Sequence, residues 1–330
     1  MRLIRTGARA TLLAALAVVA VGCSTARPVD LATVDSVDGP QPVGVVENPP
    51  PPSTSSAPVP QCDPTASYRP MDALPAAGQM PANTTMRRIQ DAGNLIAGVD
   101  QNTFLFGFRN PTTNALEGFD IDRVREIAEA IFGDPNRVQF QVITSKEREE
   151  ALEKGRVHVV VRTYTANCER WQKVNFSSIY YTAGQRLLVE RSSKVTSLEQ
   201  LSGKKVCAAK GSTSIKTIDA HEANPVPVAV DNWSDCLIML QQGQVAAVST
   251  DDTILLGMVA QDPNVKIVGE KFTQEPYGIG IPKADVDMVK FVNAVLAQSI
   301  QSGRWQGSFN RWLGRTGEQA APPVPAAYRD

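Results

Sequence analysis

Short apolar runs alternate along this chain with stretches whose apolar residues recur every three or four positions. Leu95–Val99 and Val157–Val161 are apolar runs of the length and composition of buried strands. Between them, Asp120–Phe132 predicts an amphipathic helix with Asp120 as its N-cap, because its apolar residues fall on one face. Those residues are Ile121, Val124, Ile127, Ala128 and Ile131.

The same alternation continues to residue 313. Thr144 and Glu147 form a capping box that predicts the next helix start. Further strands are expected at Arg186–Val189, Lys205–Ala208, Val226–Val230, Val245–Ser249 and Tyr277–Ile281. Further helices are expected from Thr213, at Trp233–Gln242, after Asp252 to about Ala260, and at Ala284–Gln301 and Gly303–Leu313. This order predicts an α/β fold with mostly parallel sheets, and 330 residues favour two domains.

The N-terminus has the pattern of an export signal. Three arginines precede an apolar run from Ala10 to Val21, which is too short to span a membrane. Gly22-Cys23 follows, which predicts a lipoprotein signal over residues 1–22 and acylation of Cys23. A soluble secreted protein cut nearby is the alternative. Without the three arginines the formal net charge moves from −1 to −4, and no basic patch favours nucleic acid.

Two segments lack the regular spacing of apolar residues that predicts helices or strands. Residues 23–82 are rich in Pro, Ser, Ala and Val and include the run Pro49–Ser56, a composition typical of an extended tether. Residues 315–330 are expected to be a flexible tail. No segment after the signal is apolar enough to span a membrane, so we expect anchoring by lipid alone.

If Cys23 carries the lipid, an even set of four cysteines remains, and export favours disulfides. Three connectivities are possible. Cys207 lies on an expected strand and Cys236 on the helix that should pack beside it, which favours Cys207–Cys236. Cys62–Cys168 would then join the N-terminal segment to the first half of the globular body. Long spacings and isolated histidines disfavour zinc, and we expect no metal and no cofactor.

The most informative segment is Thr163–Arg170. Two hydroxyl residues, Thr163 and Thr165, follow an apolar strand and precede Arg170, whose planar guanidinium matches a carboxylate. A turn that opens a short helix also presents backbone N–H groups. The pattern indicates a socket for a small carboxylate; an ordinary threonine-capped helix start with a surface arginine is the alternative.

Several blocks in this order resemble the bacterial type II solute-binding proteins, specifically the polar amino-acid branch. The resemblance covers about residues 90–313, and the tether and lipobox resemble actinobacterial glutamine-binding-type lipoproteins. The blocks are Gly118–Asp122, Thr163–Arg170 with Val174–Ser177, Leu201–Val206 with Gly211–Ser214, Asp251–Leu255, Tyr277–Ile279 and Gly303–Leu313.

The resemblance implies two α/β lobes joined by two crossing strands, with a ligand bound between them. Lobe 1 is expected at residues 83–183 and 275–314, and lobe 2 at 184–274. The hinges are expected near Tyr181–Gln185 and Gln274–Tyr277.

The resemblance also assigns roles around the ligand backbone. Arg170 would hold the α-carboxylate, with N–H groups of Thr165 and Thr213. Asp252 would accept the α-ammonium, with Asp251 as the alternate. The Thr163 carbonyl and Thr165 hydroxyl would complete this cage, and the neighbouring Ser212 is included as a ligand-binding residue.

Two residues of the expected side-chain pocket predict different ligands. Ser145 and Arg148 match the segment that reads the ligand side chain in the glutamate/aspartate-binding branch. Asp100 lies where glutamine binders have an aspartate, which would favour an amide unless Arg148 or Arg162 pairs with it. Phe106 would be a pocket wall, and Trp233 maps onto a position that can face the ligand.

These features predict a monomeric, extracytoplasmic, lipid-anchored amino-acid-binding protein that is not an enzyme. Asp or Glu is the expected ligand, with Asn or Gln weaker and exclusive glutamine binding as the alternative. The expected partner is an ABC importer; a membrane sensor protein is the other possibility. An enzyme would require a catalytic acid with a raised pKa, and the sequence shows no nucleophile–base pair, phosphate-binding loop or metal set.

Overall fold

The computed structural model describes residues 39–50, 61–317, 319, 321 and 327–329. The predicted signal peptide and the predicted acylation site Cys23 lie outside the described residues. The chain from Pro40 onward contains two large β-sheets, each with its own set of helices and its own hydrophobic core. We call the part around the five-stranded sheet lobe 1 and the part around the six-stranded sheet lobe 2.

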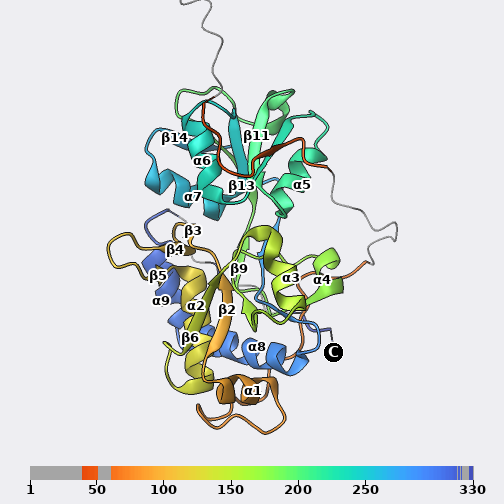
Figure 1. Ribbon diagram of the computed structural model, residues 1–330, viewed down its shortest axis with the longest axis vertical. Helices are drawn as coiled ribbons and strands as arrows, with labels where there is room; N and C mark the ends of the chain where they lie inside the picture. The colour runs from red at the N-terminus through yellow and green to blue at the C-terminus, as the bar shows by residue number, and fades with distance from the viewer. Residues whose placement is uncertain (1–38, 51–60, 318, 320, 322–326, 330) are drawn as a thin grey trace, which may run out of the picture. The chain divides into compact units, whose positions relative to one another are not determined.

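Lobe 1 is built on the sheet order β6-β2-β7-β16-β8. Strand β2 pairs in parallel with β6 and β7, whereas β16 pairs antiparallel with β7 and β8. Figure 1 shows α2, α8 and α9 gathered beside this sheet. The strands are Leu95–Val99 (β2), Val138–Val142 (β6), Val159–Val160 (β7), Val174–Phe176 (β8) and Gly280–Pro282 (β16). The helices are Thr85–Ala92 (α1), Phe119–Phe132 (α2), Arg148–Glu153 (α3), Cys168–Lys173 (α4), Val286–Gln301 (α8) and Arg304–Trp312 (α9).

A small three-stranded sheet accompanies lobe 1, and a short 3-10 helix precedes α3. The small sheet comprises Asn102–Thr103 (β3), Gly107–Arg109 (β4) and Leu116–Glu117 (β5). The 3-10 helix, Ser145–Glu147, has the predicted capping box: Thr144 N donates to a Glu147 carboxylate oxygen at 2.7 Å.

Lobe 2 is built on the sheet order β1-β12-β11-β13-β10-β14. Strand β11 pairs in parallel with β12 and β13, and the outer pairings are antiparallel. Helices α5, α6 and α7 lie beside this sheet (Figure 1). The strands are Val46–Glu47 (β1), Gln185–Glu190 (β10), Lys205–Ala209 (β11), Val226–Val230 (β12), Ala247–Asp251 (β13) and Val265–Val268 (β14). The helices are Thr213–Asp219 (α5), Trp233–Gln241 (α6) and Asp252–Gln261 (α7), with a 3-10 helix at Leu198–Leu201.

Two short strands pass between the lobes where the hinges were expected. Tyr181–Ala183 (β9) and Glu275–Tyr277 (β15) form a separate antiparallel pair. The α/β fold is confirmed, but both large sheets are mixed. Strands β10 and β16, which follow the crossing strands, pair antiparallel with their neighbours, and so does β1. The single strand expected at Tyr277–Ile281 is two strands, β15 and β16, which belong to different sheets.

Asp120 is not the N-cap of its helix, contrary to prediction. Helix α2 begins at Phe119, and Gly118 occupies the N-cap position without a side-chain cap. The carboxylate of Asp120 instead accepts hydrogen bonds from Thr163 N at 2.8 Å and from the Tyr180 hydroxyl at 2.7 Å. Asp120 therefore ties the start of α2 to the loop that follows β7.

The structure contains the two disulfides that the sequence favoured, Cys62–Cys168 and Cys207–Cys236. The segments expected to be tether and tail also contribute structure. Strand β1 pairs with β12 at the edge of lobe 2, and Ser67, fully buried, pairs with Tyr328. The composition of these segments could not predict this pairing, because the partners that hold them lie far away in the sequence. Across the described residues no helix is both long enough and apolar enough to cross a membrane.

Gly118 is required by the close approach of two backbone segments. Its φ is +132°, and a Cβ at this position would lie 2.1 Å from the carbonyl oxygen of Phe106. That carbonyl accepts a hydrogen bond from Asp120 N at 2.9 Å. A side chain on residue 118 would therefore push α2 away from the β3–β5 region.

We expect Gly118→Ala to lower the free energy of unfolding by about 3 kcal/mol, because it combines backbone strain with overpacking. Gly78→Ala is the matched control, since Gly78 also has positive φ (+77°) but no atom lies within 4 Å of the point where a Cβ would be added. The control should lose only about 1 kcal/mol. Urea unfolding at equilibrium measures both, and equal losses would contradict the close-approach argument.

Candidate functional site

Arg170 lies on α4 with its guanidinium turned inward. The side chain of Asn167 caps this helix and accepts a hydrogen bond from Arg170 N at 2.9 Å. The guanidinium donates to the Thr165 carbonyl at 2.7 Å and, across the lobes, to the Gly211 carbonyl at 3.1 Å. Its nearest carboxylate among the described residues is Glu149, at 3.5 Å. Arg170 is 5% exposed, so this charge is buried with incomplete compensation.

Arg148 lies beside Arg170 and is not a solvated helix residue. It is 3% exposed, and its guanidinium donates to carbonyl groups of Ser145 at 2.9 Å and Gly211 at 3.2 Å. Both guanidinium groups lie over the ring of Tyr164, at 4.4 Å for Arg148 and 4.9 Å for Arg170. Burial, and then the charge of Arg170, lower the pKa of Arg148 to about 9. Among the described residues no carboxylate forms an ion pair with Arg148, and the two arginines place two buried positive charges over the same ring.

The Thr163 loop is held in an uncommon backbone conformation. Thr163 has a φ of 40°, and its N–H donates to Asp120. Its carbonyl accepts a hydrogen bond from Arg148 at 3.4 Å, which places it toward the arginine pair. Burial raises the pKa of Asp120 to about 7, and the hydrogen bond from Tyr180 opposes this rise.

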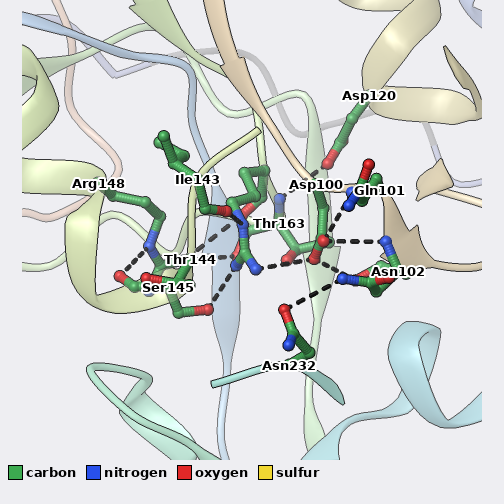
Figure 2. A network of polar contacts seen from close by, with 12 residues as sticks. Asp100, Gln101, Asn102, Asp120, Ile143, Thr144, Ser145, Arg148, Thr163 and Asn232 are labelled. Atoms are coloured by element: carbon green, nitrogen blue, oxygen red, sulfur yellow. Dashed lines mark hydrogen bonds and ion pairs between the residues drawn. The ribbon is translucent and has the colours of Figure 1, made fainter. Parts of the chain in front are cut away.

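Asp100 is fully engaged within lobe 1 (Figure 2). One carboxylate oxygen accepts hydrogen bonds from the backbone N–H groups of Gln101 and Asn102, at 2.7 and 3.0 Å. The other accepts one from the Thr103 hydroxyl at 2.6 Å and forms an ion pair with Arg162 at 2.9 Å. Arg162 therefore resolves the charge conflict that the sequence left open.

Arg162 also fixes the neighbouring polar groups. Its guanidinium donates to the Ser145 hydroxyl and to the Ile143 carbonyl. Ser145 is thus an acceptor for Arg162 here. Close to Asp100, Asn102 donates to Asn232 of lobe 2 at 3.1 Å (Figure 2), which adds another direct contact between the lobes.

Asp251 is a buried acid that contacts the crossing strand β15. It ends β13, is 4% exposed, and accepts a hydrogen bond from the Tyr277 hydroxyl at 2.5 Å. Its other carboxylate oxygen is buried and has no hydrogen-bond partner among the described residues. Burial, together with the negative charge of Glu275, raises the pKa of Asp251 to about 8. A cationic group would satisfy this oxygen and favour the ionised form.

Asp252, one residue further on, is engaged with the hinge. It forms an ion pair with Lys271 at 2.5 Å, and its other oxygen accepts a hydrogen bond from Gly184 N at 3.1 Å. Gly184 follows β9, so Asp252 attaches the start of α7 to a crossing segment.

Glu275 is a site residue that the sequence analysis missed. It lies on β15, is 3% exposed, and accepts hydrogen bonds from the hydroxyls of Thr165 at 2.7 Å and Thr213 at 2.8 Å. These threonines come from different lobes, so Glu275 joins both to the hinge. A carboxylate directly before Pro276 and Tyr277, at an expected hinge, was the available signal.

The remaining predicted residues lie in supporting positions. Ser212 caps α5, and its hydroxyl donates to the Ala209 carbonyl at 2.7 Å. Phe106 is fully buried and packs edge-on against Tyr277, beneath the site. Trp233 is 3% exposed within the lobe 2 core. Tyr164, between the two threonines of the motif, was not predicted, because only the folded loop places both arginines on its ring. No cluster of three potential metal ligands occurs within the described part of the chain.

The two lobes, the crossing strands and the charged site define a two-lobe solute-binding protein of the type II periplasmic-binding-protein fold. A solved structure of an ancestral arginine-binding protein bound to glutamine superposes with a TM-score of 0.63 at 34% identity, covering 67% of this chain and 98% of that one. The profile of the bacterial extracellular solute-binding proteins, family 3, matches residues 95–315. The chain belongs to this family.

Two curated relatives show which members of the family are similar to the chain. The ABC transporter glutamine-binding protein GlnH of Bacillus subtilis is 38% identical over 230 residues, which is 69% of this chain and 84% of that protein. The glutamate-binding protein GluB of Corynebacterium efficiens is 30% identical over 264 residues, covering 76% and 90%. The chain is thus similar both to a relative named for glutamine, whose side chain is an amide, and to one named for glutamate, whose side chain is an acid.

We expect the stability of the ligand-free protein to decline as pH rises from about 5 to 8. In the folded state Asp120 keeps its proton up to about pH 7 and Asp251 up to about pH 8, whereas the unfolded chain has released both protons. Folding therefore takes up protons, and each group contributes a slope of up to about 1.4 kcal/mol per pH unit. Asp251→Asn should flatten the decline measured by urea unfolding. Asp91→Asn, on the exposed part of α1, is the charge-matched control, and parallel profiles for all three proteins would contradict the assignment.

Proposed function

We propose that this protein binds an amino-acid zwitterion between its lobes, with Asp or Glu preferred and Asn or Gln weaker. The arginine pair on lobe 1 carries the argument. Arg148 and Arg170 bring two buried positive charges to one point, and the one carboxylate paired with them in the described chain is that of Glu149, 3.5 Å from Arg170. Asp251, on lobe 2, offers a buried carboxylate oxygen that has no hydrogen-bond partner among the described residues. Anion and cation sites on opposite lobes suit a ligand that carries both charges.

In this proposal Arg170 holds the α-carboxylate in a bidentate pair, aided by backbone N–H groups of Thr165 and Thr213. The hydroxyls of these threonines are already directed to Glu275. Glu275 therefore fixes Thr165 of lobe 1 and Thr213 of lobe 2 relative to each other at the proposed carboxylate site.

Asp251 accepts the α-ammonium, and Asp252 supports the hinge. Each has one buried oxygen without a hydrogen-bond partner among the described residues, but that of Asp252 forms an ion pair with Lys271 at 2.5 Å, whereas that of Asp251 has no such pair. The neighbouring Glu275 adds negative potential at the ammonium. Contacts from both lobes make the ligand stabilise the conformation in which the lobes meet.

Arg148 reads the ligand side chain, which favours a carboxylate over an amide. The competing glutamine-selective arrangement would use Asp100 as the reader. Both oxygens of Asp100 already accept two interactions each, including the ion pair with Arg162, so little capacity remains for a ligand amide.

The family and the N-terminal sequence support the cellular role that we propose. Names of relatives such as the ABC transporter glutamine-binding protein support delivery of the ligand to an ABC importer. Cys23 would anchor the protein by lipid on the outer face of the cytoplasmic membrane, with residues 23–82 as its leading segment. The protein acts as a monomer and as a binder, not an enzyme. Signalling through a membrane partner is the second role that amino-acid binding would permit.

Isothermal titration of the chain from residue 39 with the twenty amino acids tests the site. This start retains β1, which pairs with β12. Arg170→Ala should lower affinity for every ligand by more than about 100-fold, because it removes a bidentate ion pair.

Arg148→Ala should weaken the binding of Asp and Glu by about 30-fold but that of Asn and Gln by only a few-fold, which reverses or removes the preference for acids. Equal losses for all ligands in both variants would refute the side-chain role of Arg148. Binding of Gln alone by the unmutated chain would favour the glutamine-selective alternative.

The two aspartates can be separated by the pH dependence of ligand affinity. Asp251 must be ionised to pair with an ammonium, so affinity should rise from pH 6 to about 8, by up to about ten-fold per unit. Asp251→Asn should reduce affinity by about 100-fold and abolish this rise. Asp252→Asn should keep the rise while weakening binding less. Loss of the rise in Asp252→Asn instead would assign the ammonium to Asp252.

A further inference from the structure

The helix that carries Arg170 is too short to be stable by itself. Helix α4 has six residues, fewer than an isolated helix needs. Its order must come from contacts with the rest of the protein. Lys283 supplies one such contact, because its ammonium donates to the Trp171 carbonyl at 2.6 Å. The other contacts described below come from the two ends of the chain.

The N-terminal segment holds α4 on both sides of Arg170. Cys168, the first residue of α4, is bonded to Cys62, 106 residues earlier in the sequence. Trp171, directly after Arg170, donates from its indole nitrogen to the Pro64 carbonyl at 3.0 Å. Cys168 and Trp171, on either side of Arg170, are thus attached to residues 62–64, a segment in which no ligand-binding residue is predicted.

The C-terminal segment completes this arrangement. The guanidinium of Arg329 lies 3.5 Å from the centroid of the Trp171 ring. It also donates to the carbonyls of Ala66 at 2.9 Å and Asp63 at 3.1 Å. The two ends pair with each other through Ser67 and residues 327–329. We call residues 62–67 and 327–329 the terminal clasp.

We propose that the terminal clasp is a positioning element for ligand binding, which sets the place of the Arg170 guanidinium through Cys168 and Trp171. The proposal rests on the proposed function, in which Arg170 holds the α-carboxylate. A bidentate pair tolerates little displacement, so loosening α4 weakens the carboxylate contact. The effect is the same for every amino acid, because all share the α-carboxylate. The side-chain reader Arg148 lies on α3, outside the clasp.

The two disulfides differ in a way that allows an independent experiment. Cys62 is exposed, whereas Cys207 and Cys236 are fully buried. An added dithiol therefore reaches Cys62–Cys168 first. It breaks the Sγ–Sγ bond to give two thiols and is itself oxidised to a cyclic disulfide.

The test compares Cys62→Ala/Cys168→Ala and Arg329→Ala with the unmodified full-length protein. Arg87→Ala, which removes an equal charge from an exposed pair with Asp91, is the control. Titrations with Glu, Asp and Asn should show affinity about ten-fold weaker for all three ligands in the double variant. Arg329→Ala should show a smaller loss with the same uniformity, and the control should show none. Mild reduction of the unmodified protein, with the opened cysteines identified by alkylation, should reproduce the double variant.

Repeating the comparison in the Arg170→Lys variant identifies the residue through which the clasp acts. That variant has already lost the bidentate guanidinium contact. Removing the clasp in it should therefore weaken ligand affinity by a further factor of less than about three. A full additional loss would overturn the proposal, as would unchanged affinity in the folded double variant or losses that depend on the ligand side chain.

Amide hydrogen exchange separates this inference from the proposed function. Opening the clasp should speed exchange at Arg170 N and Trp171 N, whose acceptors belong to Asn167, whether or not a ligand is present. If the unmodified protein binds no amino acid, the proposed function fails while exchange still tests the clasp. Unchanged exchange in α4 would overturn the clasp as a positioning element.

Discussion

Arg170 and Arg148 carry two positive charges into the protein, and much of the surrounding structure can be understood from the cost of placing them there. A buried guanidinium needs acceptors for its donors and opposite charge nearby. Here the acceptors are mainly carbonyls, including that of Gly211 from the other lobe, and the ring of Tyr164 lies beneath both groups. Carbonyl and π contacts hold the arginines, and within the described chain a single carboxylate, that of Glu149, balances only one of their two charges. Their charge remains available to an anionic ligand, which is the property that the proposed function requires.

The other buried charges are arranged so that they do not compete. Arg162 is neutralised by Asp100, and Lys271 by Asp252. Those pairs are internal to the scaffold. Asp251 differs, because its hydrogen bond from Tyr277 leaves one oxygen unused. The hinge strand β15 contributes both Tyr277 and Glu275, so the segment that connects the lobes also adjusts the electrostatics of the site. The position of β15 and the protonation of Asp251 are therefore physically linked.

The ends of the chain add a second level of support. Segments with the composition of a spacer pair with β12, with each other and with α4. A proline- and serine-rich sequence cannot build a core of its own, but it can supply single anchor residues to one that exists. Cys62, Pro64 and Arg329 are such anchors, and they converge on the helix that carries the principal arginine. The terminal segments and the order of the site are thus connected in this protein.

Local sequence by itself determined the α/β alternation, most element positions, the capping box at Thr144 and the importance of Arg170, Arg148 and the Asp251-Asp252 pair. The alternation, the capping box and the carboxylate socket at Arg170 follow from hydrophobic period and residue chemistry, which act over a few positions, whereas the roles predicted for Arg148, Asp251 and Asp252 came from the resemblance to the family. The tertiary structure decided the rest. It separated Asp251 from Asp252, because a shift of one residue at the end of a strand changes which partner a side chain meets. It paired Asp100 with Arg162, and it moved Asp120 from a helix cap to a support for Thr163. It brought Glu275 and Tyr164 into the site. Each of these depends on contacts between residues far apart in sequence, and such contacts exist only after the two lobes and the crossing strands have formed.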